Sequence, residues 1–318
     1  MTDMFTDTVT VFAPATSANL NIGFDILGLA LGGAGDIVTM KRISSPKVII
    51  ERIDGTQKYL PTNPIKNTAS YPLIRMIEDL HLDFGFSFRL QKGIPLGSGL
   101  GGSAASAVAS VVAANYLLPN KLSQSQMLKY ILDGEERASK ARHTDNILPC
   151  FFGGITLGNE DTVIQLPIPR SLCVVIWTPD CQVLTQESRN ILPQQISLNS
   201  SVKQSFHLSA FVSYLYTEQL HKIRDIFVDE IIEPHRKSKI PNFDKAKLKA
   251  YEAGALGFGI SGSGPSCFAL CENSSIAKNV CEEVKKIFME RTNLQFVWKG
   301  SISNKGVHII TGKSNEVS

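Results

Sequence analysis

The residues most clearly suited to chemistry form a glycine-rich segment between a strand-like and a helix-like stretch. Residues 93–105 read Gly-Ile-Pro-Leu-Gly-Ser-Gly-Leu-Gly-Gly-Ser-Ala-Ala, with glycines at 97, 99, 101 and 102. Glycine has no side chain to keep a ligand away from the backbone amides. The next helix is predicted to begin near Ser103, so its unpaired N–H groups and positive dipole end face the same space. The segment therefore predicts a phosphate-binding loop.

Three interpretations of this loop compete. A plain strand-to-helix turn does not require four glycines within six residues. Gly97, Gly99 and Gly102 satisfy the dinucleotide pattern G-x-G-x-x-G, which also needs an acidic residue about 20 positions further on. Residues 121–126 contain no acid, and the next acidic residue is Asp133. A Walker loop needs Gly-Lys-Ser/Thr, which is absent. A nucleotide triphosphate loop of a non-Walker kind fits best.

Three other segments combine glycines with polar residues. Asn19 and Asp25 stand among apolar neighbours in residues 13–30, where they form an Asx turn or face a small polar substrate. Residues 143–154 read His-Thr-Asp-Asn-Ile-Leu-Pro-Cys-Phe-Phe-Gly-Gly. Residues 254–266 read Gly-Ala-Leu-Gly-Phe-Gly-Ile-Ser-Gly-Ser-Gly-Pro-Ser, which is either a second ligand loop or an ordinary turn before a strand.

These segments together resemble the GHMP kinases and, among them, the homoserine kinases. Residues 95–105 resemble the GHMP phosphate loop P-x-x-x-G-L-G-S-S-A-A, with Gly102 where serine is usual. The opening is similar to S-A-N-L-G-P-G-F-D-x-L-G, with Asn21-Ile22 in place of Gly-Pro. Residues 143–154 resemble H-x-D-N-x-x-P-x-x-x-G-G, and residues 254–266 resemble the last GHMP motif, a loop that folds over the phosphate loop.

Two fragments bear on the substrate. Thr185-x-x-x-Arg189-x-x-Leu-Pro193 and Glu233-Pro-His-Arg236 each place an arginine where the resemblance implies binding of an amino-acid carboxylate. A bidentate guanidinium suits a carboxylate, whereas a sugar kinase would not need the pair. Read without the family, both arginines are solvated surface residues.

The resemblance implies transfer of the γ-phosphate of ATP to the hydroxyl of L-homoserine, giving O-phospho-L-homoserine and ADP in threonine biosynthesis, with Mg²⁺. It implies ATP contacts from eleven loop residues: Pro95, Leu96, Gly97, Ser98, Gly99, Leu100, Gly101, Gly102, Ser103, Ala104 and Ala105. It implies substrate contacts from eight residues: Asn19, Asp25, His143, Asn146, Thr185, Arg189, Arg236 and Gly262.

The resemblance also implies the residues that carry the reaction. Glu135 and Ser103 are the expected ligands of the metal. Glu136, next to Glu135 on the same predicted helix, is the alternative reading, a surface glutamate without a role at the metal. Asp25, Glu135 and Asn146 are the expected catalytic residues, with Asp25 the candidate carboxylate nearest the attacking hydroxyl. Another GHMP kinase of the mevalonate or sugar type, and a non-catalytic ligand-binding relative, are the alternative functions.

The elements that must position these residues alternate between strand and helix patterns. Strands are expected at 9–13, 36–41, 47–53, 84–90, 155–158, 172–178, 266–270, 295–299 and 307–311. Helices are expected at 67–80, 103–118, 123–140, 198–233, 244–253 and 276–288, and the second of these is apolar almost all round and should be buried.

This pattern predicts an α+β protein of two domains, with a proline-containing junction at 165–170. Residues 1–166 are expected to form the nucleotide-binding domain and residues 167–318 the C-terminal GHMP domain. The resemblance implies a left-handed β-α-β phosphate-loop unit in the first and a ferredoxin-like α/β sandwich in the second.

Composition narrows the class of protein. The chain has 318 residues, 43% apolar and 19% charged, with a net charge of +3. These values are typical of a globular protein, and without a basic stripe they argue against nucleic acid or a membrane surface as the main partner. No signal peptide or membrane span is recognisable, and the six cysteines form no C-x-x-C pair. Free thiols in the cytoplasm are therefore expected, and the resemblance implies a possible homodimer.

Overall fold

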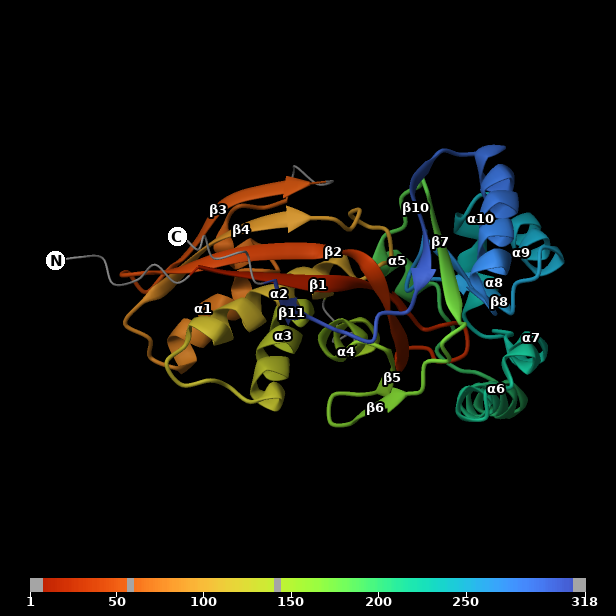
Figure 1. Cartoon of the computed structure of the whole chain (residues 1–318), viewed down its shortest axis with the longest axis horizontal. Coiled ribbons are helices and arrows are strands. Elements are labelled where there is room, and N and C mark those ends of the chain that lie inside the picture. The colour runs from red at the N-terminus through yellow and green to blue at the C-terminus, as the bar shows by residue number, and fades with distance from the viewer. Residues whose placement is uncertain (1–7, 56–59, 140–143, 311–318) are drawn as a thin grey trace, which may run out of the picture.

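The computed structural model describes residues 8–55, 60–139 and 144–310. Two sheets run through it, and helices cover them (Figure 1). The first sheet has the order β11-β1-β2-β4-β3, and β5 and β6 extend it from β2. Its strands are β1 (Thr8–Ala18), β2 (Leu27–Ile43), β3 (Val48–Gly55), β4 (Gly85–Lys92), β5 (Ile155–Gly158), β6 (Val163–Leu166) and β11 (His308–Ile309).

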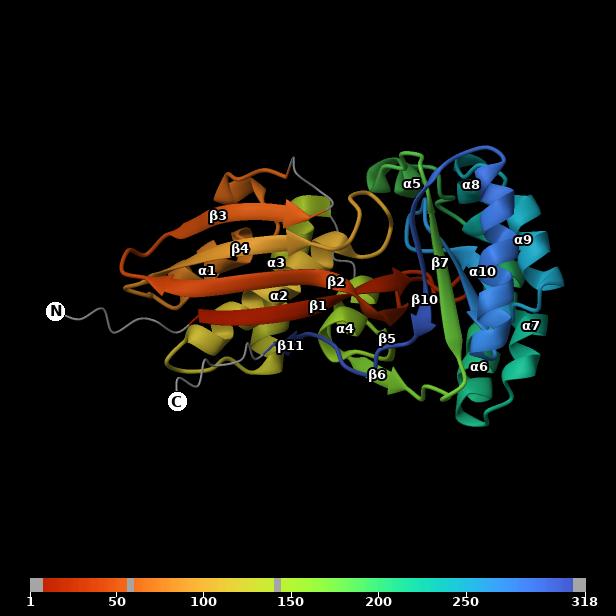
Figure 2. The ribbon, with the colours of Figure 1, turned by 45° about the horizontal axis from the view of Figure 1, so that its top comes forward.

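Helices α1 to α4 cover one face of this sheet (Figures 1 and 2). They are α1 (Tyr71–Asp79), α2 (Gly102–Leu117), α3 (Gln124–Ser139) and α4 (Thr144–Phe152), and a 3₁₀ turn, η1 (Pro64–Lys66), precedes α1. Helix α2 packs on β1 and β2 and is surrounded by α1, α3 and α4. Residues 104–111 are all buried, so the helix is enclosed on every side, which confirms the prediction of a buried helix.

The second sheet is antiparallel, with the order β10-β7-β9-β8. Its strands are β7 (Cys173–Pro179), β8 (Gly257–Ile260), β9 (Cys267–Cys271) and β10 (Leu294–Ser301). Helices α9 (Phe243–Glu252) and α10 (Ser274–Met289) cover one face, where Val175 and Trp177 are buried. The alternate residues Val174 and Ile176 belong to the main core, as the two-residue period of a strand requires.

Five short elements complete this half: α5 (Thr185–Asn190), η2 (Leu220–Lys222), α7 (Ile223–Ile226), α8 (Glu233–Arg236) and η3 (Lys237–Lys239). The predicted helix over 198–233 was wrong in its length, because α6 spans only Leu198–Tyr216. Glu218 adopts a left-handed φ of 53°, which ends the helix. The Asp229 carboxylate then binds the backbone N–H groups of residues 231–233, so a new, short helix begins there.

The helix predicted from residue 67 begins only at Tyr71, because the Asn67 side chain accepts a hydrogen bond from Ala69 N and forms a turn. Within the described residues, the strand predicted at 307–311 covers only His308–Ile309 and pairs with β1, so this segment returns to the first sheet; residue 311 lies outside the described residues. The division at residues 166 and 167 stays a prediction. Within the described residues, we find no helix with the length and apolar character of a membrane span.

Candidate active site

The glycine-rich loop joins β4 to α2, and its glycines are needed for two different reasons. Gly97, Gly99 and Gly101 adopt φ values of 66°, 78° and 67°, which favour glycine. A Cβ at Gly99 would lie 2.5 Å from the Ser261 carbonyl oxygen, and one at Gly101 would lie 2.1 Å from Thr16 Oγ1. A Cβ at Gly97 would meet nothing within 4 Å. The loop is therefore closely packed at its base and open at Gly97.

A buried ion pair supports the loop from below. Lys92 Nζ contacts the Asp36 carboxylate and donates to Gly102 O and Ser106 Oγ, both at 2.9 Å. The other Asp36 oxygen accepts from Gly93 N and Ile94 N at 3.1 and 3.3 Å. The side chains of Lys92 and Asp36 are 3% and 0% exposed. Because the two charges contact both ends of the loop, they fix its path between strand and helix.

The last glycine-rich segment, residues 254–266, packs against the glycine-rich loop that precedes α2. Ser261 Oγ donates to Gly99 O at 2.9 Å, and Ser266 N donates to Ser98 O at 3.0 Å. Gly262 adopts a φ of 57° and its N–H donates to Ala18 O at 3.2 Å. The two glycine-rich segments thus form one continuous backbone wall.

A cavity of about 440 Å³ lies along this wall. It is lined by most of the predicted site residues: Asn19, Asp25, Pro95, Leu96, Gly97, Ser98, Gly99, Gly101, Gly102, Ser103, Ala104, Glu135, Asn146, Thr185, Arg189, Arg236 and Gly262. Leu100 and Ala105 point into the core instead, with 1% and 0% exposure. His143 lies outside the described residues. The structure thus brings the remaining predicted site residues together around one cavity. The role of each of these residues stays a prediction.

One end of the cavity carries opposite charges. Arg189 Nη2 lies 2.8 and 2.9 Å from the two oxygens of Asp25, and both side chains are 38% exposed. Asn19 accepts from Asp25 N at 2.9 Å and donates to Gly262 O at 3.1 Å. Arg236 Nη1 donates to the same Gly262 oxygen at 2.8 Å. A ligand with both a positive and a negative group matches this end.

Arg236 is the buried member of this group. Its side chain reaches from α8 past Ser188 O, and the residue is 5% exposed. Burial lowers the pKa of Arg236, and the nearby Asp25 carboxylate opposes that shift. The Phe24 ring lies 5.3 Å from the Arg236 guanidinium carbon and 5.7 Å from that of Arg189. Cation–π contact with this ring holds both guanidinium groups at the cavity.

Asn146 lines the cavity next to Gly101, where an added Cβ would lie 2.8 Å from Asn146 Oδ1. Thr16 Oγ1, on β1, donates to Asn146 Oδ1 at 2.7 Å. This hydrogen bond uses the acceptor of the amide and orients its Nδ2 donor group. An amide in this orientation is suited to binding an oxygen atom and not to removing a proton.

The predicted metal ligands fit a hard cation. Glu135 of α3 is 6% exposed and lines the cavity together with Ser103 in the first turn of α2. Mg²⁺ prefers oxygen ligands and is commonly bound through one or two carboxylates together with substrate phosphates. Among the described residues, no group of three or more histidine, cysteine or acidic residues suited to a metal occurs.

Several lining residues were missed from the sequence. They are Leu60, Thr68, Lys92, Ile94, Ser106, Asp145, Leu184, Gln186 and Ser263. Asp145 lies inside the H-x-D-N pattern, and its position there was the available signal. Lys92 and Ser106 flank the glycine loop, but nothing local marks them as partners of Asp36. All six cysteines are free, as predicted.

Comparison with known proteins assigns the fold to a class. The model of the GHMP kinases N terminal domain matches residues 66–154, and that of the GHMP kinases C terminal domain matches residues 215–290. A mevalonate kinase from Staphylococcus aureus shares the fold, with a TM-score of 0.63 at 15% identity over 93% of this chain and 99% of that one. The fold is that of a GHMP kinase, and the chain belongs to this class.

Two relatives narrow the class. Homoserine kinase of Xylella fastidiosa is 37% identical over 299 residues, which cover 94% of this chain and 93% of the relative. The crystal structure of homoserine kinase from Cytophaga hutchinsonii has a TM-score of 0.91 and 39% identity, covering 98% of this chain and 99% of that one. The chain belongs to the homoserine kinase family.

Proposed function

We propose that this chain transfers the γ-phosphoryl group of ATP to the side-chain hydroxyl of L-homoserine. The observation that carries the proposal is the continuity of one cavity. Its glycine-lined part ends at the N-terminus of α2, and its other end holds Asp25, Arg189 and Arg236. The first part suits phosphate groups, and the second suits the ammonium and carboxylate of an amino acid.

The reaction exchanges one phosphorus–oxygen bond for another. The homoserine hydroxyl oxygen attacks the γ-phosphorus, and the bond from that phosphorus to the bridging β,γ-oxygen breaks. ADP leaves with the electron pair of the broken bond, and the proton of the hydroxyl passes to solvent. The products are O-phospho-L-homoserine, a precursor in threonine biosynthesis, and ADP. The cytoplasm is the proposed compartment.

The residues of the loop bind and orient the nucleotide. The backbone N–H groups of residues 97–103 donate to the phosphates, and the dipole of α2 adds a positive potential. Glu135 and Ser103 would hold Mg²⁺, which neutralises charge on the phosphates when bound. Asn146 donates to an oxygen of the reacting groups. Catalysis then rests on positioning and electrostatic stabilisation, as phosphoryl transfer permits.

The test is release of ADP from ATP and Mg²⁺ by the purified chain, with L-homoserine, mevalonate or galactose as acceptor. Turnover that depends on L-homoserine, with the other two at least 100-fold lower in kcat/KM, is expected. Equal or greater turnover with mevalonate or galactose would overturn the choice of substrate. Binding of ATP without phosphorylation of any acceptor would point to a non-catalytic relative.

A further inference from the structure

The turn that carries Asn19 has an unusual backbone. Asn19, Leu20 and Asn21 adopt φ values of 70°, 43° and 63° in succession, a left-handed path that side-chain-bearing residues rarely follow. Such a turn persists only where its surroundings hold it. Leu20 is fully buried, and Ile22 is 1% exposed. Asn19 is held by hydrogen bonds to Leu27 O and Gly262 O, and Asn21 adds further contacts.

The Asn21 side chain is enclosed by the C-terminal half of the chain. Its Nδ2 donates to Phe258 O on β8 at 2.9 Å and to Glu233 Oε2 on α8 at 3.4 Å. The backbone carbonyl oxygen of Asn21 accepts a hydrogen bond from Gln204 Nε2 of α6 at 3.2 Å. A Cβ on Gly259 would lie 1.8 Å from Asn21 Oδ1. The amide thus fills a space that exists only because residue 259 is glycine.

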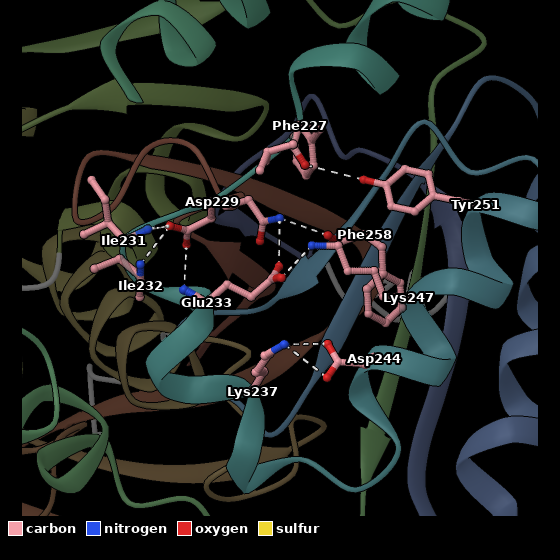
Figure 3. Close-up of polar contacts among 12 residues, drawn as sticks. Phe227, Asp229, Ile231, Ile232, Glu233, Lys237, Asp244, Lys247, Tyr251 and Phe258 are labelled. Carbon is pink, nitrogen blue, oxygen red and sulfur yellow. Dashed lines mark hydrogen bonds and ion pairs between the residues drawn. The ribbon is translucent and has the colours of Figure 1, made fainter. Parts of the chain in front are cut away.

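Glu233 connects this amide to the substrate arginine. Figure 3 shows Glu233 between Asp229 and Phe258, with Lys247 close by. Lys247 Nζ lies 2.5 Å from Glu233 Oε1, and the Asp229 carboxylate accepts from the backbone N–H groups at the start of α8. Glu233 is the first residue of α8 and Arg236 is the last.

Two routes therefore tie the turn to Arg236. One runs through Gly262 O, which accepts from both Asn19 and Arg236. The other runs through Asn21 and Glu233. The cavity between these groups is only about 10 Å³, too small for more than one water molecule, so Arg236 has little space to shift away from the main cavity and toward Asn21.

We propose that Asn21 is a positioning residue for the amino-acid substrate. Its amide sets the placement of Asn19 and Asp25 relative to Arg236, although Asn21 does not line the main cavity. This inference rests on the proposed function, because it concerns recognition of the substrate at the same site. Asn21 stands where the homoserine kinase pattern has glycine. In this chain, the Asn21 side chain therefore fixes the conformation of the turn through its own hydrogen bonds.

The test is Asn21→Gly, which keeps the left-handed backbone accessible and removes only the amide. A rise of about tenfold or more in the KM for L-homoserine is expected, with the KM for ATP changed less than twofold, because only the amino-acid end loses a support. Asn242→Gly is the matched control. Asn242 has a φ of 55° and donates from Nδ2 to Ile287 O at 2.8 Å, away from the cavity. It should leave both KM values unchanged.

Gly259→Ala provides a second, independent variant. Its methyl group must displace the Asn21 amide, so the KM for L-homoserine should rise as in Asn21→Gly. The double variant Asn21→Gly/Gly259→Ala should be no worse than either single one, because the clash has gone. Unchanged KM in Asn21→Gly, or additive effects in the double variant, would overturn the inference. Absence of L-homoserine turnover by the unaltered chain would instead overturn the proposed function and, with it, the inference.

Discussion

Arg189 and Asp25 form an ion pair on the wall of the cavity, with Arg189 Nη2 2.8 and 2.9 Å from the two carboxylate oxygens. Both side chains are more than one-third exposed, and such pairs contribute only about 0–1 kcal/mol to stability. Separating them therefore costs little. A zwitterion can insert between them. Its ammonium then takes the place of Arg189 at the Asp25 carboxylate, and its carboxylate takes the place of Asp25 at the Arg189 guanidinium.

Asp25→Asn tests this role of Asp25. We expect the KM for L-homoserine to rise about 30-fold, since a hydrogen bond to a charged group contributes about 2 kcal/mol, and kcat to change less. Steady-state kinetics with each substrate varied gives both values. Asp180→Asn is the control, because Asp180 is exposed and its side chain contacts Gln295 instead of the cavity. A fall in kcat of about 1000-fold at constant KM would instead identify Asp25 as the group that accepts the hydroxyl proton.

Arg236→Leu should have a larger effect on the same constant. The guanidinium is buried and fixed at Gly262 O, so a substrate carboxylate meets a preorganised partner there. We expect the KM for L-homoserine to rise about 100-fold or more and the KM for ATP to stay within about twofold. Arg224→Leu, at an exposed position of α7, should change neither KM value. If the KM for L-homoserine were also unchanged in Arg236→Leu, the arginine would serve structure alone.

Local patterns carried most of the correct predictions. The glycine spacing at 97–102 marks a loop on its own, and the aliphatic run of α2 marks a buried helix on its own. Partners distant in sequence were not predictable in this way. Asp36 meets Lys92, 56 residues away, only because β2 pairs with β4 in a register that sets Ile37 opposite Gln91.

The same limit applies to Thr16 and Asn146, which are 130 residues apart and meet through the packing of α4 on β1. Where local rules were followed too far, the prediction failed. The helix expected over 198–233 ends at Tyr216, because Glu218 adopts a left-handed conformation. No spacing rule states that Glu218 adopts this conformation, because the surrounding packing decides it.

Glu135→Ala should lower kcat about 100-fold or more in the presence of Mg²⁺, because loss of one major electrostatic contact in phosphoryl transfer has effects of this size. The measurement is a titration with Mg²⁺ at saturating ATP and L-homoserine. Glu136→Ala, one residue further on the same helix and exposed, is the matched control and should retain nearly full turnover. Near-normal turnover by Glu135→Ala would remove Glu135 from the mechanism.

Thr16→Val tests the orientation of the Asn146 amide. Valine keeps the shape of threonine but lacks the hydroxyl that donates to Asn146 Oδ1. The amide then loses its fixed orientation, and we expect kcat to fall about tenfold, which corresponds to about 1.4 kcal/mol. Thr10→Val is the control, because Thr10 lies on the same strand and its hydroxyl meets Thr39 far from the cavity. Equal loss of kcat in both variants would assign the effect to the strand and not to Asn146.

Lys92→Met should both lower the free energy of unfolding and raise the KM for ATP, because Lys92 supports the fold and the glycine-rich loop. Removal of the ammonium leaves the Asp36 carboxylate buried without its counter-charge, which costs about 3–5 kcal/mol. Urea unfolding measures this cost, and Lys41→Met, which breaks the exposed pair with Glu51, should cost less than about 1 kcal/mol.

The double variant Lys92→Met/Asp36→Leu separates the two effects of the pair. It should regain part of the lost stability, because no buried charge remains unpaired. The KM for ATP should nevertheless stay raised, since Gly93 N and Ile94 N have lost the carboxylate that holds the start of the loop. An ATP KM that returned to normal along with the stability would show that the pair supports the fold without shaping the loop.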